Sequence, residues 1–240
     1  MDLKKHCRLY ESEAVQQVTG KSIRPGGLSI TKRALKYCDF AIGANILDVG
    51  CGAGATVEYL LSKQFHAVGI DPSPTMIEIA KKRNQQLPLF LAPGEQLPFS
   101  DQTMDGVIAE CTLSLMHNLP LALQQICRVL KPQGYLIVSD LYIRNNNSGS
   151  ITDLPLDCCL GGAVPQHQWL ERIIAAGFTN ELWEDHTKCL KELVAQLIFT
   201  HGSLENFWCE ILGGCEQAKQ MEKLLKYYKV GYFLLIARKK

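Results

Sequence analysis

The feature that most constrains the fold of this chain is a repeated alternation of short apolar runs with amphipathic stretches. Apolar runs that predict strands lie at 45–49, 66–70, 87–92, 105–110 and 135–140, and helical patterns lie between them at 55–63, 74–85 and 120–130. Strands that alternate with helices are typical of βα units and a parallel sheet. The sequence therefore predicts a doubly wound α/β fold.

The rest of the chain continues this pattern. It predicts a helix at 165–176, a strand at 178–184, helical segments across 190–227 and a final strand at 230–238. The run of asparagine and serine at 145–150 predicts a surface loop. No linker is long enough to separate two domains, so we expect a single domain.

Composition excludes several classes of function. The 25 basic and 24 acidic residues leave a formal net charge of +1, and the basic residues form no stripe that would follow a nucleic acid backbone. The sequence has no uncharged apolar run of about 18 residues and no signal-peptide pattern at its start, so we expect a cytoplasmic protein with no membrane partner. None of its ten cysteines forms a CxxC pair, so we expect free thiols and no structural metal site.

A glycine-rich segment, Asp48-Val49-Gly50-Cys51-Gly52-Ala53-Gly54, joins the first predicted strand to the first predicted helix. Glycines let a backbone turn sharply and approach a ligand closely. The third glycine comes one residue earlier than in the GxGxxG fingerprint of dinucleotide sites, which argues against a nicotinamide cofactor. Asp71 ends the next strand, where a carboxylate accepts hydrogen bonds from both hydroxyls of a ribose. The alternative is that Asp71 only forms the turn or caps the helix that begins at Pro74.

Five segments in order resemble the motifs of class I S-adenosylmethionine-dependent methyltransferases. They are DVGCGAG (48–54), GIDPS (69–73), GEQLPF (94–99), DGV (105–107) and RVLKPQG (128–134). The resemblance covers about residues 32–178 and implies a Rossmann-like, seven-stranded, mostly parallel sheet whose last strand is antiparallel. We expect an N-terminal arm (1–40), a cofactor-binding core (41–184), a helical insertion (185–229) and the last strand (230–240).

The resemblance also implies which residues contact S-adenosylmethionine. They are Asp48, Gly50, Cys51, Gly52 and Gly54 of the glycine loop at the methionine end, Asp71 at the ribose, Pro72 and Met76 beside the adenine, Gly94, Glu95 and Gln96 at the adenine edge, and Glu110 and Cys111 near the sulfonium. Many members of the family carry an aspartate where this chain has Pro93, which leaves the adenine amino group to Glu95 or to the backbone.

The acceptor of the methyl group is less defined, because in-line displacement needs alignment more than a fixed catalytic residue. We expect a small-molecule acceptor. Four segments, 109–115, 139–142, 159–163 and 176–178, are similar to arsenite methyltransferases. In that family a cysteine before LGGA and a second cysteine before a Gly-Gly pair bind the metalloid as thiolates. Cys159 and Cys209 match these positions, whereas Val57 stands near the place of another metalloid cysteine. The alternative is that both cysteines only pack in the core.

The segments at 94–99 and 128–134 also resemble methyltransferases of quinone biosynthesis and other small-molecule C- and O-methyltransferases. Such enzymes use a general base or an ionised acceptor. His117 or His167 could serve as that base. Arg24 precedes a Pro-Gly-Gly turn that would bring the arm over the carboxyl edge of the sheet, where Arg24 would either meet a carboxylate or lie in solvent. A third possibility is a non-catalytic module that only binds S-adenosylmethionine.

Overall fold

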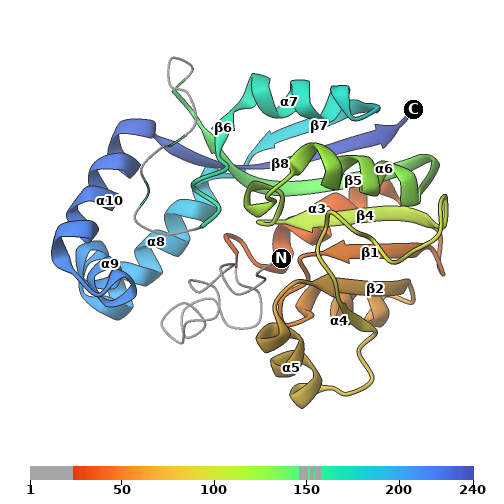
Figure 1. Cartoon of the computed structure of the whole chain (residues 1–240), viewed down its shortest axis with the longest axis horizontal. Coiled ribbons are helices and arrows are strands. Elements are labelled where there is room, and N and C mark those ends of the chain that lie inside the picture. The colour runs from red at the N-terminus through yellow and green to blue at the C-terminus, as the bar shows by residue number, and fades with distance from the viewer. Residues whose placement is uncertain (1–23, 146–150, 152–153, 155–157) are drawn as a thin grey trace.

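The computed structural model describes residues 24–145, 151, 154 and 158–240. Most of the predicted arm (1–23) and most of the predicted surface loop (146–150) therefore lie outside the described residues. Figure 1 shows the remainder as a twisted central sheet with helices on both of its faces and a group of three helices beyond one end of the strands.

The sheet has the strand order β3-β2-β1-β4-β5-β8-β7, with the short β6 paired to β5. The strands are β1 (Asn45–Val49), β2 (His66–Asp71), β3 (Leu89–Leu91), β4 (Met104–Glu110), β5 (Leu130–Ile143), β6 (Val164–Pro165), β7 (Phe178–Asp185) and β8 (Val230–Lys239). All pairs are parallel except those that β8 makes with β5 and β7. The predicted doubly wound, mostly parallel sheet with an antiparallel last strand is confirmed.

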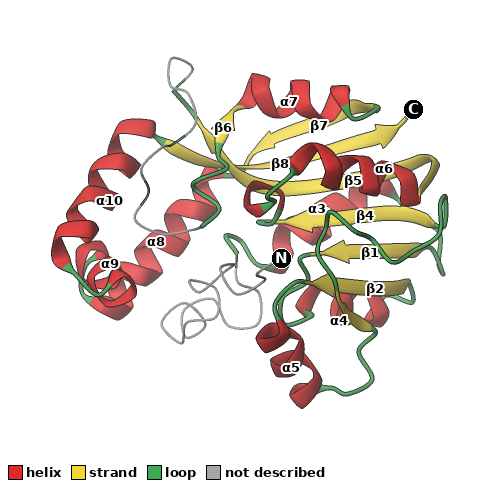
Figure 2. Ribbon diagram, in the orientation of Figure 1, coloured by secondary structure: helices red, strands yellow, loops and turns green. Residues whose placement is uncertain are grey.

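Helices cover both faces of this sheet (Figure 2). They are α3 (Leu28–Cys38), α4 (Ala55–Ser62), α5 (Pro74–Arg83), α6 (Leu119–Val129), α7 (Gln166–Ala175), α8 (Thr187–His201), α9 (Leu204–Leu212) and α10 (Cys215–Tyr228), with a 3₁₀ turn, η2, at Leu113–Leu115. Alternate residues of each strand enter two separate apolar cores. Ile46 and Ile108 belong to the core under α3 and α4, whereas Leu47 and Val107 belong to the core under α6 and α7. None of the helices in the described part of the chain is long and apolar enough to cross a membrane.

Helix α3 is an element that the sequence analysis treated only as part of the arm. Its residues Ile30, Ala34 and Cys38 are four apart and all buried, so they form one apolar stripe that packs against the sheet. The helix begins directly after Gly27, and the turn before it leads the chain back from the carboxyl edge of the sheet. This placement fixes Arg24 beside the site described below.

The predicted helical insertion consists of three helices, α8, α9 and α10. The breaks fall at Gly202-Ser203 and at Gly213-Gly214. Gly202 and Gly213 both have positive φ, which glycine adopts without strain, and the Ser203 side chain caps α9 by accepting a hydrogen bond from the amide of Asn206. The three helices thereby fold back on one another beyond the ends of β5 and β8 (Figure 1).

Candidate functional site

Two cavities open at the carboxyl ends of the parallel strands, and they share Cys111 as a lining residue. The smaller one lies against the glycine loop and has a volume of about 120 Å³. Nine of the predicted cofactor residues line it, namely Gly50, Gly52, Asp71, Pro72, Met76, Gly94, Glu95, Glu110 and Cys111. The carboxyl edge of a parallel sheet is where such folds bind ligands, so the position of this cavity agrees with its composition.

Four other predicted cofactor residues do not line this cavity. Asp48 is buried within β1, and Gln96 is exposed. The sulfur of Cys51 faces β2, since a Cβ placed on Gly69 would lie 2.8 Å from it. Gly54 forms the N-cap of α4, against Leu89. Asp48, Cys51 and Gly54 therefore shape the loop from the side away from the cavity, whereas Gln96 takes no part in it.

The structure adds lining residues that the sequence analysis missed. Thr112, Leu115 and Met116 follow β4 and line the small cavity, together with Pro93. Their position in the sequence could have identified them, because ligands of such folds bind next to the residues that follow the carboxyl ends of the strands. His117, predicted as a candidate base, lines this same cavity and not the larger of the two. It also lines a third cavity, of about 900 Å³, beside η2, α6 and α7.

The glycine loop fits tightly against the end of β4. The amides of Gly50 and Cys51 both donate to the carbonyl of Ile70, at 2.8 and 2.9 Å. Gly50 has φ of 73°, and a Cβ there would lie 2.1 Å from Oγ1 of Thr112. A side chain at this position is excluded both by backbone conformation and by contact. The loop therefore presents backbone, without side chains, to the cavity.

Asp71 is held at the end of β2 by two backbone amides. Its Oδ2 accepts from the amide of Gly52 and its Oδ1 accepts from the amide of Ser73, both at 2.8 Å. The cap of α5 is Ser73, whose hydroxyl accepts from the amide of Met76. Asp71 is thus not the helix cap. It does stabilise the turn through the Ser73 amide, and its carboxylate also borders the cavity in a fixed orientation.

A buried ion pair joins the N-terminal arm to the end of β4. Nη2 of Arg24 lies 2.8 Å from Oε2 of Glu110, and both side chains are almost fully buried. The hydroxyls of Thr31 and Thr56 donate to the Glu110 carboxylate at 2.8 and 3.0 Å. Burial alone would lower the pKa of Arg24, but the carboxylate of Glu110 opposes this and the pKa is raised overall. Arg24 was expected either to meet a carboxylate or to lie in solvent, and the structure shows the contact with a carboxylate.

Asp48 lies in the same buried charge cluster. Burial, followed by the negative charge of Glu110, raises the pKa of Asp48 to about 8. A carboxyl group with such a pKa is largely protonated at neutral pH. Its ionisation on raising the pH therefore works against folding.

We expect Asp48→Asn to remove part of the pH dependence of stability. The folded pKa lies above the unfolded one, so the wild-type protein loses stability as the pH rises from about 4 to 8. Asparagine does not ionise and lacks this loss. Thermal unfolding of both proteins between pH 5 and 9 measures the effect, and the stability of the variant relative to wild type should increase with pH up to about 8 and level off above it. Parallel curves across this range would contradict the assigned pKa.

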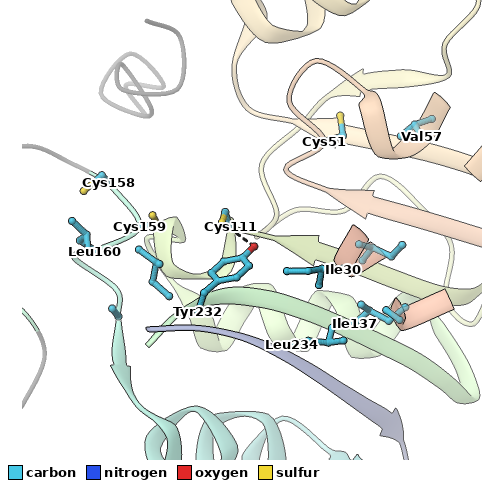
Figure 3. Packing of buried hydrophobic residues seen from close by; sticks show 14 of the residues in the cluster. Ile30, Cys51, Val57, Cys111, Ile137, Cys158, Cys159, Leu160, Tyr232 and Leu234 are labelled. Atoms are coloured by element: carbon cyan, nitrogen blue, oxygen red, sulfur yellow. Dashed lines mark hydrogen bonds between the residues drawn. The ribbon is translucent and has the colours of Figure 1, made fainter. Parts of the chain in front are cut away.

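The larger cavity has a volume of about 810 Å³ and lies between the ends of β5 and β8 and helices α8, α9 and α10. Where it meets the small cavity, the Cys111 sulfur lies 3.3 Å from the Tyr232 hydroxyl (Figure 3). This hydroxyl in turn donates to the hydroxyl of Ser139 at 3.0 Å. Burial raises the pKa of the Cys111 thiol well above its usual value. Cys111 is therefore a neutral thiol at physiological pH.

The two cysteines of the metalloid hypothesis are not brought together. Cys159 lines the large cavity with Cys158 and Cys111. Cys209 does not line it, and its thiol instead hydrogen-bonds Cys215, which raises its pKa to about 11. Val57 is buried in the core under α4 (Figure 3). Among the residues that the structure describes, no group of three His, Cys, Asp or Glu side chains could hold a metal ion.

The turn that carries Cys158 and Cys159 packs closely on η2. A Cβ at Gly162 would lie 2.0 Å from the carbonyl oxygen of Ser114.

We expect Gly162→Ala to lower the free energy of unfolding by about 1–3 kcal/mol, since the added methyl group forces the two backbones apart. Gly161→Ala is the matched control, because its Cβ would meet the nearest atom at an ordinary 3.5 Å. Urea unfolding of both variants tests this contact, and equal stabilities would contradict it.

Comparisons with known proteins agree with this geometry. Residues 47–138 match the family described as a methyltransferase domain. The uncharacterized methyltransferase YodH of Bacillus subtilis is 42% identical over 117 residues, which are 47% of this chain and 50% of that protein. The chain spans about half the length of the curated relatives it matches.

Solved structures resemble the chain over nearly its full length. The 4+2 cyclase SpnF is 25% identical and covers 92% of this chain and 83% of its own, with a TM-score of 0.70. Phosphoethanolamine N-methyltransferase 2 of Haemonchus contortus, in complex with phosphomonomethylethanolamine and S-adenosylhomocysteine, is 17% identical and covers 94% and 56%, with a TM-score of 0.75. The latter similarity concerns the fold alone.

Proposed function

We propose, from the premise that this chain belongs to the class I S-adenosylmethionine-dependent methyltransferases, that it transfers a methyl group from S-adenosylmethionine to a small organic acceptor. One observation carries the proposal: the cavity at the glycine loop and the large cavity meet at Cys111. A methyltransferase needs two ligands side by side, whereas a module that only binds the cofactor needs one.

The residues of the small cavity fit the cofactor. The Asp71 carboxylate would accept hydrogen bonds from the ribose hydroxyls, Met76 and Pro72 would pack on the adenine, and the backbone at Gly50 and Gly52 would border the methionine. The bound cofactor supplies an electrophilic methyl group. The nucleophilic atom of the acceptor forms a bond to this methyl carbon while the carbon–sulfur bond breaks, and the electron pair of that bond remains on sulfur.

Alignment is the main contribution that we assign to the protein. The described lining of the large cavity contains no histidine, and its one carboxylate, Glu222, is ion-paired with Lys226. These residues therefore offer the acceptor no general base, and His117 lines the small cavity at the glycine loop instead. Holding two reactants in line contributes roughly 7–11 kcal/mol to lowering a barrier of this kind.

An organic acceptor is favoured over a thiolate-bound metalloid. The metalloid alternative requires Cys159 and Cys209 in one site, and only Cys159 lines the large cavity. We further propose that the protein acts in the cytoplasm on a dissolved substrate. Its formal net charge of +1 gives it no general attraction to nucleic acid or to an anionic membrane surface.

Calorimetry with S-adenosylmethionine and S-adenosylhomocysteine tests the first half of the proposal. We expect binding of one molecule per chain for both, and none for NADH. Transfer of the labelled methyl group from S-adenosylmethionine to a panel of organic acids, phenols, amines and arsenite tests the second half. A folded protein that binds neither cofactor form would refute the proposal, and transfer to arsenite that survives Cys159→Ser would remove the thiolate version.

A further inference from the structure

The large cavity combines apolar walls with a strongly one-sided charge. Its walls are mostly aliphatic and aromatic side chains from α8 and α9, such as Leu193, Leu197 and Phe207. Its described ionisable lining comprises five cations, Arg24, Arg144, Lys191, Lys226 and Lys229, against the one carboxylate of Glu222. An apolar body with an anionic group is the chemistry that such a lining complements.

Unsatisfied polar atoms point in the same direction. Nε1 of Trp208 and Nε of Arg24 are buried and have no hydrogen-bond partner, and both residues line the large cavity. Both atoms are donors with no capacity to accept. A buried donor without a partner costs free energy unless a ligand supplies an acceptor, so the cavity lacks acceptors rather than donors.

The cations at the rim are available. Arg144, Lys191 and Lys229 are exposed, and none of the three forms a salt bridge with any residue in the described ranges. Lys226 differs, because it is paired with Glu222 at 3.3 Å. The negative group of a ligand would therefore meet three positive charges at this rim that lack a salt bridge in the described part of the chain, although Arg144 also acts electrostatically on the Asp185 carboxylate.

The rim and the transfer point are far apart. The amide of Cys111 donates to the carbonyl of Ser139 at 2.7 Å, so these two residues lie side by side at the same distance along the strands. Arg144 follows Ser139 by five residues along the extended chain that includes β5, which at the usual rise of a strand places it about 16 Å further on. A ligand that reaches both points has to be elongated.

We propose that the methyl acceptor is an elongated amphipathic anion. Its apolar body lies between α8 and α9, its reacting atom lies beside Cys111, and its carboxylate or phosphate group is bound at the rim by Arg144, Lys191 and Lys229. The inference rests on the proposed function for the meaning of the Cys111 end, but the binding of such an anion is measurable without any methyl transfer.

The test uses twelve-carbon probes below their aggregation limits, with the full-length chain. Calorimetry compares dodecanoate, dodecyl phosphate, dodecanol and dodecylammonium, and S-adenosylhomocysteine binding is measured on the same samples. We expect one anionic probe per chain, bound at least about tenfold more tightly than dodecanol, because hydrogen bonds to charged groups are the stronger ones. The ratio of the affinities for dodecanoate and dodecyl phosphate shows which anionic headgroup the site prefers. Equal binding of dodecanol, preference for dodecylammonium, or no binding of any probe would overturn the inference.

Variants separate the rim charges from a general charge effect. Lys191→Met with Lys229→Met should weaken binding of the preferred anion about tenfold or more and leave dodecanol unchanged. Lys36→Met with Lys63→Met removes the same charge from residues that do not line the cavity and should change neither. Trp208→Phe keeps the aromatic ring without its donor and should weaken the anion roughly threefold or more. An unaltered affinity of the Lys191→Met, Lys229→Met variant for the anion would contradict the proposal. A wild-type protein that does not bind S-adenosylhomocysteine would instead contradict the proposed function.

Discussion

Asp71→Ala is expected to weaken the binding of S-adenosylhomocysteine by at least about 100-fold. Hydrogen bonds to a charged group contribute roughly 1.5–3 kcal/mol each, and a ribose offers two hydroxyls to one carboxylate. The Asp71 carboxylate is also the acceptor for the amide of Gly52, at 2.8 Å. Its removal therefore loosens the glycine loop in addition to removing the ribose contact. Isothermal titration calorimetry at constant salt measures the change.

The matched control is Asp101→Ala. Asp101 is an exposed carboxylate paired with Arg128 at the surface, 2.7 Å away, and it does not line either cavity. We expect its removal to leave the affinity within about twofold of wild type, since exposed pairs contribute about 0–1 kcal/mol to stability. A thermal unfolding curve for Asp71→Ala shows whether the variant is folded. A folded Asp71→Ala protein with wild-type affinity would exclude the ribose role.

Arg24→Met is expected to lower the free energy of unfolding by about 3–5 kcal/mol. Removing one member of a buried ion pair leaves the other charge without compensation in a medium of low polarity. Arg24 and Glu110 retain only 9% and 3% of their side-chain exposure, so water cannot replace the lost partner. Denaturant unfolding at pH 7.5 measures the loss.

Arg24→Met combined with Glu110→Gln should be more stable than Arg24→Met alone, because the stranded charge is then gone. The surface pair of Lys82 and Glu78 provides the comparison, with both side chains more than half exposed. Lys82→Met should cost less than about 1 kcal/mol. If Arg24→Met proved as mild as Lys82→Met, the ion pair would contribute nothing to holding the arm on the sheet.

Hydrophobic periodicity predicted seven strands of the sheet and missed the two-residue β6. The runs at 45–49 and 105–110 become β1 and β4, because the strands of a parallel sheet are buried on both faces and therefore read as continuous apolar segments. The antiparallel direction of β8 came only from the family resemblance. Helix α3 was missed although its apolar stripe was present in the sequence, since residues 1–40 were treated as one arm.

The glycine loop and Asp71 were predictable because their spacing is local. Strand β1, the glycine turn and helix α4 determine where the loop lies, and the next strand, β2, brings Asp71 beside Gly52. The functions of Glu110 and Arg24 could not be derived in this way. Their 2.8 Å contact joins residues 86 positions apart (110 minus 24), and no periodic pattern encodes such a pair.

The sequence by itself thus determined the fold class and the cofactor-side geometry, because both follow from short segments whose backbone conformation depends on nearby residues. Only the tertiary structure decided the acceptor side. Helices α8 and α9 contribute Leu193 and Trp208 to the lining of the large cavity, which includes Cys159 but not Cys209. The shape and charge of that cavity depend on how three helices pack against the ends of β5 and β8, and packing between distant segments is set by side-chain contacts across the whole molecule.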